Sequence, residues 1–218
     1  REVGLELKNV SLYYGKKTVL ENISTKISRG EVIALVGKNG TGKTTFSRAL
    51  CGLHRETKGD FFLDGRVISK KKRQKISYMV MQDVNYELFA ESVEAECSFG
   101  IKNPDSGLVA ETMNVLELTP FAKQHPGTLS GGQKQRTAVA VSMVCRRDLL
   151  LFDEPTSGLD RRGMERFGSL LRDLQTSAAL SLVITHDPEL IMSCCTHILH
   201  IENGRVLAFY PLNKAGIE

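Results

Sequence analysis

A run of eight residues, Gly37-Lys38-Asn39-Gly40-Thr41-Gly42-Lys43-Thr44, has the residue types and spacing of a phosphate-binding loop. It fits the pattern G-x-x-x-x-G-K-[ST], in which backbone N–H groups surround the phosphates of a nucleotide. The glycines allow positive φ angles and leave no Cβ between the backbone and the anion. The run therefore predicts a site for nucleotide phosphates.

The residues on either side of this loop supply the elements that must position it. Residues 32–36 form a short apolar, β-branched run typical of a buried parallel strand. After the loop, Phe46, Ala49, Leu50 and Leu53 recur at the spacing of one helix face. A helix that begins at the loop points its unpaired N–H groups and the positive end of its dipole at the anion. Strand, loop and helix together strengthen the prediction.

A second glycine motif, Leu129-Ser130-Gly131-Gly132-Gln133, precedes a segment rich in alanine and valine. Ser130 and Gln133 have the S-x-x-Q spacing of a capping box, which predicts Ser130 as the N-cap of a helix. The two glycines leave the first N–H groups of that helix uncovered. The motif therefore predicts a second anion-binding helix end in the same chain.

Polar residues follow two further apolar strands. Residues 149–152 lead into Asp153-Glu154, and residues 180–185 lead into His186-Asp187. Carboxylates and a histidine at strand ends are suited to metal binding and acid–base chemistry. From local pattern alone, a carboxylate in a turn and a structural histidine are the alternatives.

Two other features of the sequence each have two interpretations. Tyr13 and Tyr14 end a predicted strand before Gly15, where an aromatic ring stacks on an adenine or simply packs on the sheet. Residues 70–75 are the most basic run of the chain, and we interpret them as a solvated loop in preference to a binding patch.

The rest of the pattern predicts an α/β organisation. Alternating residues around Leu5 and Ile23 predict an antiparallel pair of strands, and Asp64-Gly65 and Asn203-Gly204 predict hairpin turns. Between residues 83 and 147 the pattern changes to short helices broken by Gly and Pro, which predicts an inserted helical subdomain.

The composition limits the size and the class of the protein. The 218 residues are 41% hydrophobic and 25% charged, as in one globular domain or one domain with a subdomain. A net charge of +4 does not indicate nucleic-acid binding by itself. No apolar run reaches the ~18 residues that a membrane span needs. Five cysteines without C-x-x-C spacing favour reduced thiols over a disulfide framework or a zinc site.

Taken together, these motifs resemble the nucleotide-binding domain of an ATP-binding cassette (ABC) ATPase, from about residue 3 to 209. Leu129-Ser130-Gly131-Gly132-Gln133 matches the family's own signature, and the motifs occur in the family's order. The resemblance implies a P-loop NTPase with a mixed central sheet, an antiparallel β subdomain and an inserted α-helical subdomain. We expect one domain over 1–218. Its core and antiparallel subdomain lie at about 1–82 and 148–218, and the helical subdomain with the signature at about 83–147.

The resemblance implies two ligands, ATP and Mg²⁺. Thr44, Asp153 and Gln82 match the family's metal-binding positions, and the resemblance implies that Gln82 also senses the transport partner. The loop residues expected to contact ATP are Gly37, Lys38, Asn39, Gly40, Thr41, Gly42, Lys43, Thr44 and Thr45. Tyr14 matches the adenine-stacking position, and we prefer it to Tyr13.

Four residues match catalytic positions of the family. Lys43 would neutralise the β- and γ-phosphates, and Glu154 would act as the general base on the attacking water. His186 matches the switch histidine at the γ-phosphate, and Gln82 completes the set.

Family members work as head-to-tail dimers, so the signature is expected to serve the P-loop of a partner domain. The residues expected to act in trans are Ser130, Gly131, Gly132, Gln133 and Asp160. Both a homodimer and a pair with a paralogous or tandem domain are compatible with one chain that keeps both half-sites.

Leu88-Phe89-Ala90, Val93 and Phe99-Gly100, following Gln82, resemble the corresponding segment of energy-coupling-factor (ECF) importers. Residues 83–85 depart from that group, which usually has Asn-Pro-Asp there. The resemblance implies a motor for import of a vitamin or metal ion, bound peripherally at the cytoplasmic face of the membrane. Its membrane subunit would contact it near Gln82 and the helical subdomain, and no nucleic acid is expected.

The alternative is a soluble ABC ATPase that acts in DNA repair, translation or Fe–S assembly. Repair members carry long coiled-coil insertions and translation members a long charged linker, and neither pattern occurs here. A nucleotide-binding module without turnover is disfavoured because Glu154 and His186 are both in place.

Overall fold

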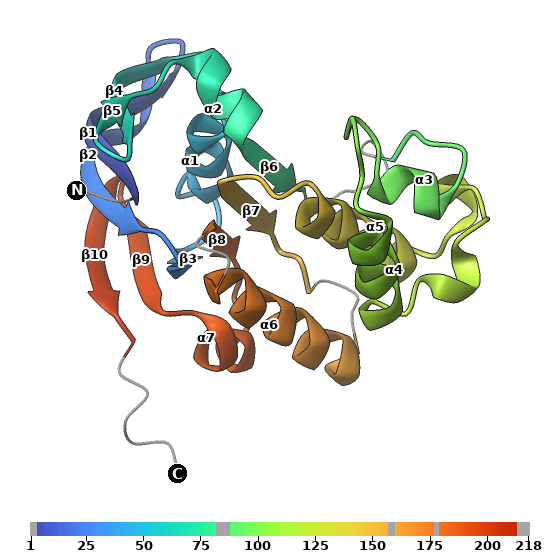
Figure 1. The fold of residues 1–218 in the computed structure, drawn as a ribbon. Coiled ribbons are helices and arrows are strands. Elements are labelled where there is room, and N and C mark those ends of the chain that lie inside the picture. The colour runs from blue at the N-terminus through green and yellow to red at the C-terminus, as the bar shows by residue number, and fades with distance from the viewer. Residues whose placement is uncertain (1–3, 82–87, 157–159, 177–178, 213–218) are drawn as a thin grey trace.

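The computed structural model of the chain describes residues 4–81, 88–156, 160–176 and 179–212. Figure 1 shows two β-sheets, helices against the larger sheet, and a further group of helices to one side. The larger sheet has the strand order β10-β9-β3-β8-β7-β6. Its strands are β3 (Val32–Val36), β6 (Ser77–Val80), β7 (Leu149–Asp153), β8 (Leu180–Ile184), β9 (His197–Glu202) and β10 (Arg205–Pro211). All neighbours pair in parallel except β9 and β10, so the sheet is mixed as predicted.

Alternation along the central strands buries both faces of this sheet. In β3, Val32 and Ala34 pack into one apolar cluster while Ile33 and Leu35 pack into the other. Successive side chains of a strand point to opposite faces, so a run without polar interruption needs cover on both sides. The apolar strands β3 and β7, with β8 whose one polar residue, Ser181, is also buried, therefore occupy the middle of the sheet, and their carboxyl ends lie at one edge.

The smaller sheet is antiparallel, with the order β2-β1-β4-β5. Its strands are β1 (Gly4–Tyr14), β2 (Lys17–Ser28), β4 (Thr57–Leu63) and β5 (Arg66–Val67). Asp64 and Gly65 between β4 and β5 have φ angles of 50° and 76°, and Asn203 and Gly204 between β9 and β10 have 49° and 75°. Two positive φ angles in succession match the hairpin turn that the Asp-Gly and Asn-Gly pairs predicted.

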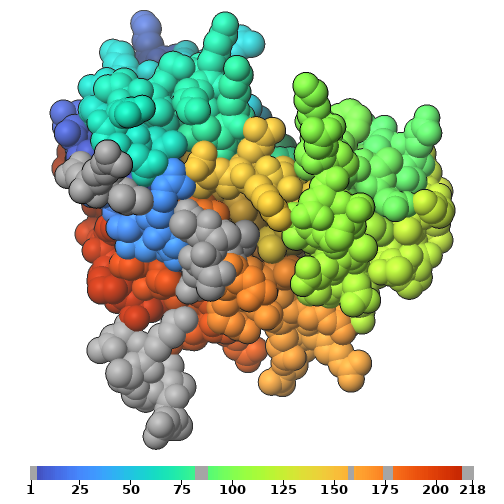
Figure 2. Space-filling view, in the orientation of Figure 1, coloured from blue at the N-terminus to red at the C-terminus, as the bar shows by residue number. Residues whose placement is uncertain are grey.

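The helices fall into two groups. Those near the sheets are α1 (Lys43–Leu50), α2 (Lys70–Ile76), α6 (Arg161–Thr176) and α7 (Pro188–Cys194). Those of the second group are α3 (Val93–Cys97), α4 (Ser106–Val115) and α5 (Gly131–Val144), with 3-10 turns η2 (Thr119–Phe121) and η3 (Pro126–Thr128). We call α3, α4 and α5 with these turns the helical lobe, which stands out on one side in Figure 2. No helix in the described part of the chain is long and apolar enough to cross a bilayer.

The basic run at residues 70–75 is not a loop, and in this respect the prediction was wrong. It forms α2, with Ser69 as the N-cap whose hydroxyl accepts a hydrogen bond from the Lys72 N–H at 3.2 Å. Arg73 is buried, with its guanidinium 3.7 Å from the centre of the Phe61 ring and a 2.7 Å bond to the Ala49 carbonyl. A cation thus fills the inward position that a sequence pattern reserves for an apolar residue.

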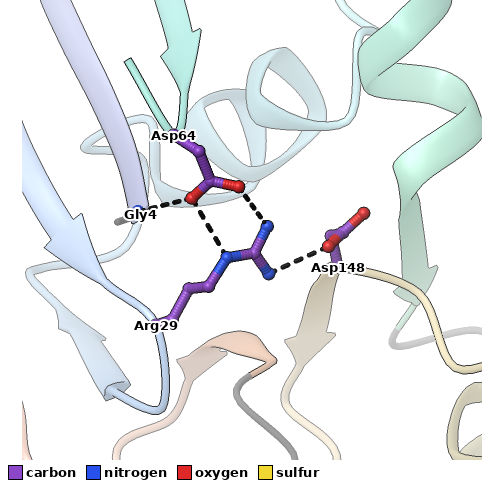
Figure 3. A network of polar contacts seen from close by, with 4 residues as sticks. All are labelled: Gly4, Arg29, Asp64 and Asp148. Atoms are coloured by element: carbon purple, nitrogen blue, oxygen red, sulfur yellow. Dashed lines mark hydrogen bonds and ion pairs between the residues drawn. The ribbon is translucent and has the colours of Figure 1, made fainter. Parts of the chain in front are cut away.

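One arginine joins the two sheets (Figure 3). The Arg29 guanidinium contacts Asp64 in the β4–β5 turn at 2.7 and 3.1 Å, and Asp148 just before β7 at 2.9 Å. The Asp64 carboxylate also accepts the Gly4 N–H at 2.9 Å. The hydrogen bond from Arg29 is the largest influence on Asp64 and lowers the pKa of its carboxyl. The antiparallel sheet is therefore tied to the strand that leads to Asp153.

Candidate functional site

The glycine loop has the backbone conformation that the motif requires. Gly42 is the N-cap of α1 with a φ angle of 98°, where an L side chain would be strained. At Gly37, whose φ angle is 153°, an added Cβ would lie 2.2 Å from the Ile201 carbonyl oxygen of β9. The loop is therefore curled against the sheet in a way that larger residues at these two positions would prevent.

Lys43 is folded back over the loop. Its Nζ donates to the carbonyls of Gly37 at 2.7 Å and Lys38 at 2.9 Å, and the residue is only 7% exposed. Burial lowers the pKa of this ammonium, while the nearby carboxylates of Glu154 and Asp153 oppose that shift. A buried positive charge thus lies where the loop is predicted to receive phosphates.

The hydroxyl of Thr44 and the carboxylate of Asp153 meet at the end of β7. Thr44 Oγ1 donates to Asp153 Oδ2 at 2.8 Å, although the residues are far apart in the sequence. Burial raises the pKa of Asp153, against the lowering effects of the Thr44 bond and the charge of Lys43. Two hard oxygen donors at this distance form the kind of ligand pair that Mg²⁺ prefers.

Glu154 and His186 are brought together because β7 and β8 are parallel neighbours. Asp153 pairs with Ile184, and the Glu154 N–H donates to the Ile184 carbonyl at 2.9 Å. The Glu154 carboxylate lies 3.4 Å from His186 Nε2. Burial raises the pKa of Glu154, and the second largest influence, His186, lowers it. Glu154 has a φ angle of 48°, an uncommon conformation for a residue with a side chain.

Tyr14 is the exposed aromatic residue of the pair considered from the sequence. It is 54% exposed, and its ring is edge-on to His54 with the centroids 4.9 Å apart. Tyr13 instead lies under the Lys58 ammonium, at 5.2 Å from the ring centre. Tyr14 therefore remains the better placed of the two for stacking.

These groups share one open pocket of about 420 Å³. It is lined by Tyr14, Lys17, Thr18, Val19, Asn39, Gly40, Gly42, Lys43, Thr44, Thr45, Asp153, Glu154, Ile184 and His186. Gly37, Lys38 and Thr41 belong to the loop without lining this pocket. The structure thus joins the predicted phosphate, metal, base and adenine positions in one place.

The signature residues lie elsewhere, at the start of α5 in the helical lobe. The predicted capping box is present, because Ser130 N donates to Gln133 Oε1 at 2.8 Å and Gln133 N donates to Ser130 Oγ at 3.3 Å. Asp160 is exposed and accepts the Gly163 N–H at 2.7 Å. The described lining of the pocket includes none of the residues predicted to act in trans.

Gln82, predicted as a metal ligand and catalytic residue, lies outside the described residues. Just after that segment, Phe89 is 70% exposed, and Phe99 beyond it is 61% exposed. The buried carboxylate of Glu96 accepts the Phe89 and Ala90 N–H groups at 2.7 and 2.5 Å. Sequence reasoning missed Glu96 and His54 because their partners depend on folded loops. A charged residue among apolar neighbours in α3 was the available signal for Glu96.

The profile of the family described as ABC transporter matches residues 20–157, more than half of the chain. A Treponema denticola protein named as an ABC transporter ATP-binding protein is 45% identical over 92% of this chain and 41% of its own length. The chain belongs to the ABC transporter family. Members of this ABC ATPase family hydrolyse ATP, and the predicted family is confirmed.

Two further relatives resemble this ABC domain over most of its length. The energy-coupling factor transporter ATP-binding protein EcfA2 of Methanospirillum hungatei is 37% identical over 94% of this chain and 54% of its own. The structure of cbiO1 from Clostridium perfringens, described as part of the ABC transporter complex cbiONQ, is 28% identical. It has a TM-score of 0.82 and covers 97% of this chain and 89% of that one. The predicted fold class is confirmed.

The ABC domain spans about two fifths of the length of the Treponema denticola relatives that it matches. The roles of its individual site residues stay predictions.

Proposed function

We propose that this ABC domain binds and hydrolyses ATP as the motor of a membrane transporter. The observation that carries the proposal is the single pocket in which Lys43, Thr44, Asp153, Glu154 and His186 converge. A phosphate-binding loop, a pair of oxygen donors and a carboxylate–histidine pair are the parts that nucleotide hydrolysis requires.

The donor set fits Mg²⁺. Thr44 Oγ1 and Asp153 Oδ2 lie 2.8 Å apart beside the phosphate loop, and we assign Gln82 as a third ligand. The ion would supply charge neutralisation for the phosphate oxygens. Thr44 and Asp153 would hold the ion, because their own hydrogen bond keeps the two oxygens on the same side of the pocket.

The other groups bind the phosphates and move the proton. Lys43 exchanges its two loop carbonyls for phosphate oxygens, which gives the buried ammonium a charged partner. Glu154 Oε1 takes a proton from the attacking water, and burial, by raising the pKa of this carboxyl, makes it a stronger base. His186 holds the γ-phosphate while its ring stays within reach of Glu154.

We also propose that two such domains enclose ATP between them. The start of α5 presents an open helix end in the helical lobe, apart from the pocket of its own chain. The signature residues Ser130 to Gln133, with Asp160, then complete the pocket of a second domain, either an identical chain or a paralogous or tandem one.

At the finer level, we propose an ECF-type importer of a vitamin or metal ion, docked peripherally at the cytoplasmic face of the membrane. The resemblance to EcfA2 and to cbiO1 supports this group. The exposed rings of Phe89 and Phe99 give the segment after Gln82 an apolar surface for a membrane subunit. In this arrangement, residues 83–147 act as the helical subdomain and the rest as the core.

The enzymatic part is tested with Glu154→Gln. Removing the general base should lower the rate of phosphate release about 10²- to 10⁴-fold while ATP binding persists, and the variant should elute as a dimer with ATP. Glu165→Gln is the matched control, because Glu165 is an exposed carboxylate that pairs with Arg161 on α6. Hydrolysis by Glu154→Gln at the unmutated rate would show that the base is assigned wrongly.

The transport part is tested by purifying the tagged protein from detergent-solubilised membranes of its own host. We expect an integral membrane subunit to co-purify in stoichiometric amount. Recovery of ribosomes or DNA without any membrane subunit would overturn the transporter assignment and leave the ATPase assignment standing.

A further inference from the structure

The loop between α1 and β4 is joined to the end of β1 that carries Tyr14. The His54 and Tyr14 rings meet at 75°, and His54 Nε2 lies 2.9 Å from the Tyr13 carbonyl oxygen. At the residue that follows Tyr14 in the sequence, the Gly15 N–H donates to the Glu56 carboxylate at 2.8 Å. The Glu56 carbonyl also accepts the Tyr13 N–H at 3.0 Å. The residues before and after Tyr14 are therefore both bonded to this loop.

The hydrogen-bond chemistry fixes the orientation of the histidine ring. A carbonyl oxygen can only accept, so His54 Nε2 carries the proton and donates to Tyr13. The ring cannot rotate without losing that bond, and His54 is only 7% exposed whereas Tyr14 is 54% exposed. A buried, oriented ring thus supports an exposed one, which suits a platform for a ligand.

The same loop is fixed to the end of α1. The N–H groups of Leu53 and His54 both donate to the Arg48 carbonyl, at 2.7 and 3.2 Å. The first residues of α1 are Lys43 and Thr44, which line the phosphate end of the pocket. One helix of about 12 Å therefore connects the phosphate loop to the support of Tyr14.

We propose that His54 and Glu56 are positioning residues that hold the Tyr14 ring in place for the base of the nucleotide. The inference rests on the proposed binding of ATP in this pocket. His54 sets the tilt of the ring through its edge contact, and Glu56 holds the backbone turn at Gly15. Neither His54 nor Glu56 lines the pocket itself, so their effect on a bound nucleotide is expected to pass through Tyr14 to the base.

The proposal is tested by comparing two ligands that share a phosphate chain. ATP carries a base, whereas inorganic tripolyphosphate does not. For His54→Ala we expect ATP affinity to fall about two- to tenfold, the range expected for one aromatic contact, with tripolyphosphate affinity unchanged. In hydrolysis assays KM should rise by a similar factor and kcat should stay the same. Glu56→Ala should act in the same direction.

Conservative variants separate positioning from simple loss of structure. His54→Gln keeps a donor for Tyr13, and Glu56→Gln keeps an acceptor for Gly15, so each should restore part of the lost ATP affinity. In a Tyr14→Ala background, His54→Ala should have no further effect. His125→Ala is the control, since that ring also contacts backbone, accepting the Gly127 N–H at 3.0 Å in the helical lobe.

Each outcome either supports or overturns the proposed role of His54 and Glu56. If ATP and tripolyphosphate affinity fell together, or if the His54 and Tyr14 effects were additive, the loop would be a support for α1 and the proposal would be wrong. Should His54→Ala fail to fold, the ATP-to-tripolyphosphate ratio for His54→Gln and Glu56→Ala makes the same decision. Failure of the unmutated protein to bind either ligand would instead refute the proposed function.

Discussion

The two helix ends that are predicted to bind anions differ in what surrounds them. At the start of α1, Lys43 and Asp153 are each only 7% exposed and face Thr44, Glu154 and His186 across one pocket. At the start of α5, the contacts among the described residues engage the serine hydroxyl and the glutamine side chain only in their own capping box. The first end is surrounded by reactive groups of its own chain, whereas the second is an open surface. This difference agrees with the proposal that one chain contributes two halves to different sites.

The largest effect is expected for a substitution in the phosphate-binding loop at the start of α1. Lys43→Ala removes the buried ammonium that is predicted to bind phosphate, and ATP affinity should fall at least about a hundredfold. Lys123→Ala is the matched control, at a lysine outside the residues predicted to contact ATP. Its side chain is 84% exposed and pairs with Glu94, so its loss should change affinity by less than about fivefold. Calorimetric titration measures both, and micromolar ATP binding by Lys43→Ala would contradict the assignment of the loop.

The second prediction concerns a substitution at the start of α5 that the fold should tolerate. A Cβ added at Gly131 meets no atom within 4 Å, so Gly131→Asp should fold normally. Its carboxylate would repel the phosphates bound by a partner, and hydrolysis should fall while ATP binding to the variant's own loop remains. Gly107→Asp, which puts the same charge at the start of α4 in the same lobe, should leave hydrolysis unchanged.

The third prediction mixes the two defective chains and asks whether two copies of the chain share a site. A dimer of one Lys43→Ala chain and one Gly131→Asp chain has a single site in which both halves are intact. The mixture should therefore recover phosphate release that neither variant has alone. Continued inactivity of the mixture, with both chains folded, would mean that this ABC domain does not share its sites with an identical chain.

The smallest effect is expected for the substitution of two N-cap serines. Ser130→Ala and Ser69→Ala each remove a serine that caps a helix, and each should cost about 1 kcal/mol in the free energy of unfolding. Only Ser130→Ala should also lower the hydrolysis rate, because Ser69 caps α2 away from both helix ends. Denaturant unfolding and phosphate release are measured on the same samples. Equal hydrolysis by the two variants would assign Ser130 a structural role alone.

The parts of the fold and site that could be predicted depend on short stretches or on one general rule. The glycine loop, the capping box and the two hairpin turns are local in sequence. Glu154 and His186 meet because both follow parallel strands, whose carboxyl ends share one edge of the sheet. What could not be predicted depends on side chains that reach across the fold. His54 bonds to Tyr13 across 41 positions, and Arg73 takes an inward place because the Phe61 ring accepts a cation.

The bridge through Arg29 has a mechanical consequence. Its guanidinium binds one carboxylate in the antiparallel sheet and another at the start of β7, and the other end of β7 is Asp153. Tyr14 lies on β1, which pairs with β4, the strand that ends beside Asp64, so the strands that carry Tyr14 and Asp153 are connected through one guanidinium. We therefore expect the predicted base end and the predicted metal end of the pocket to move together.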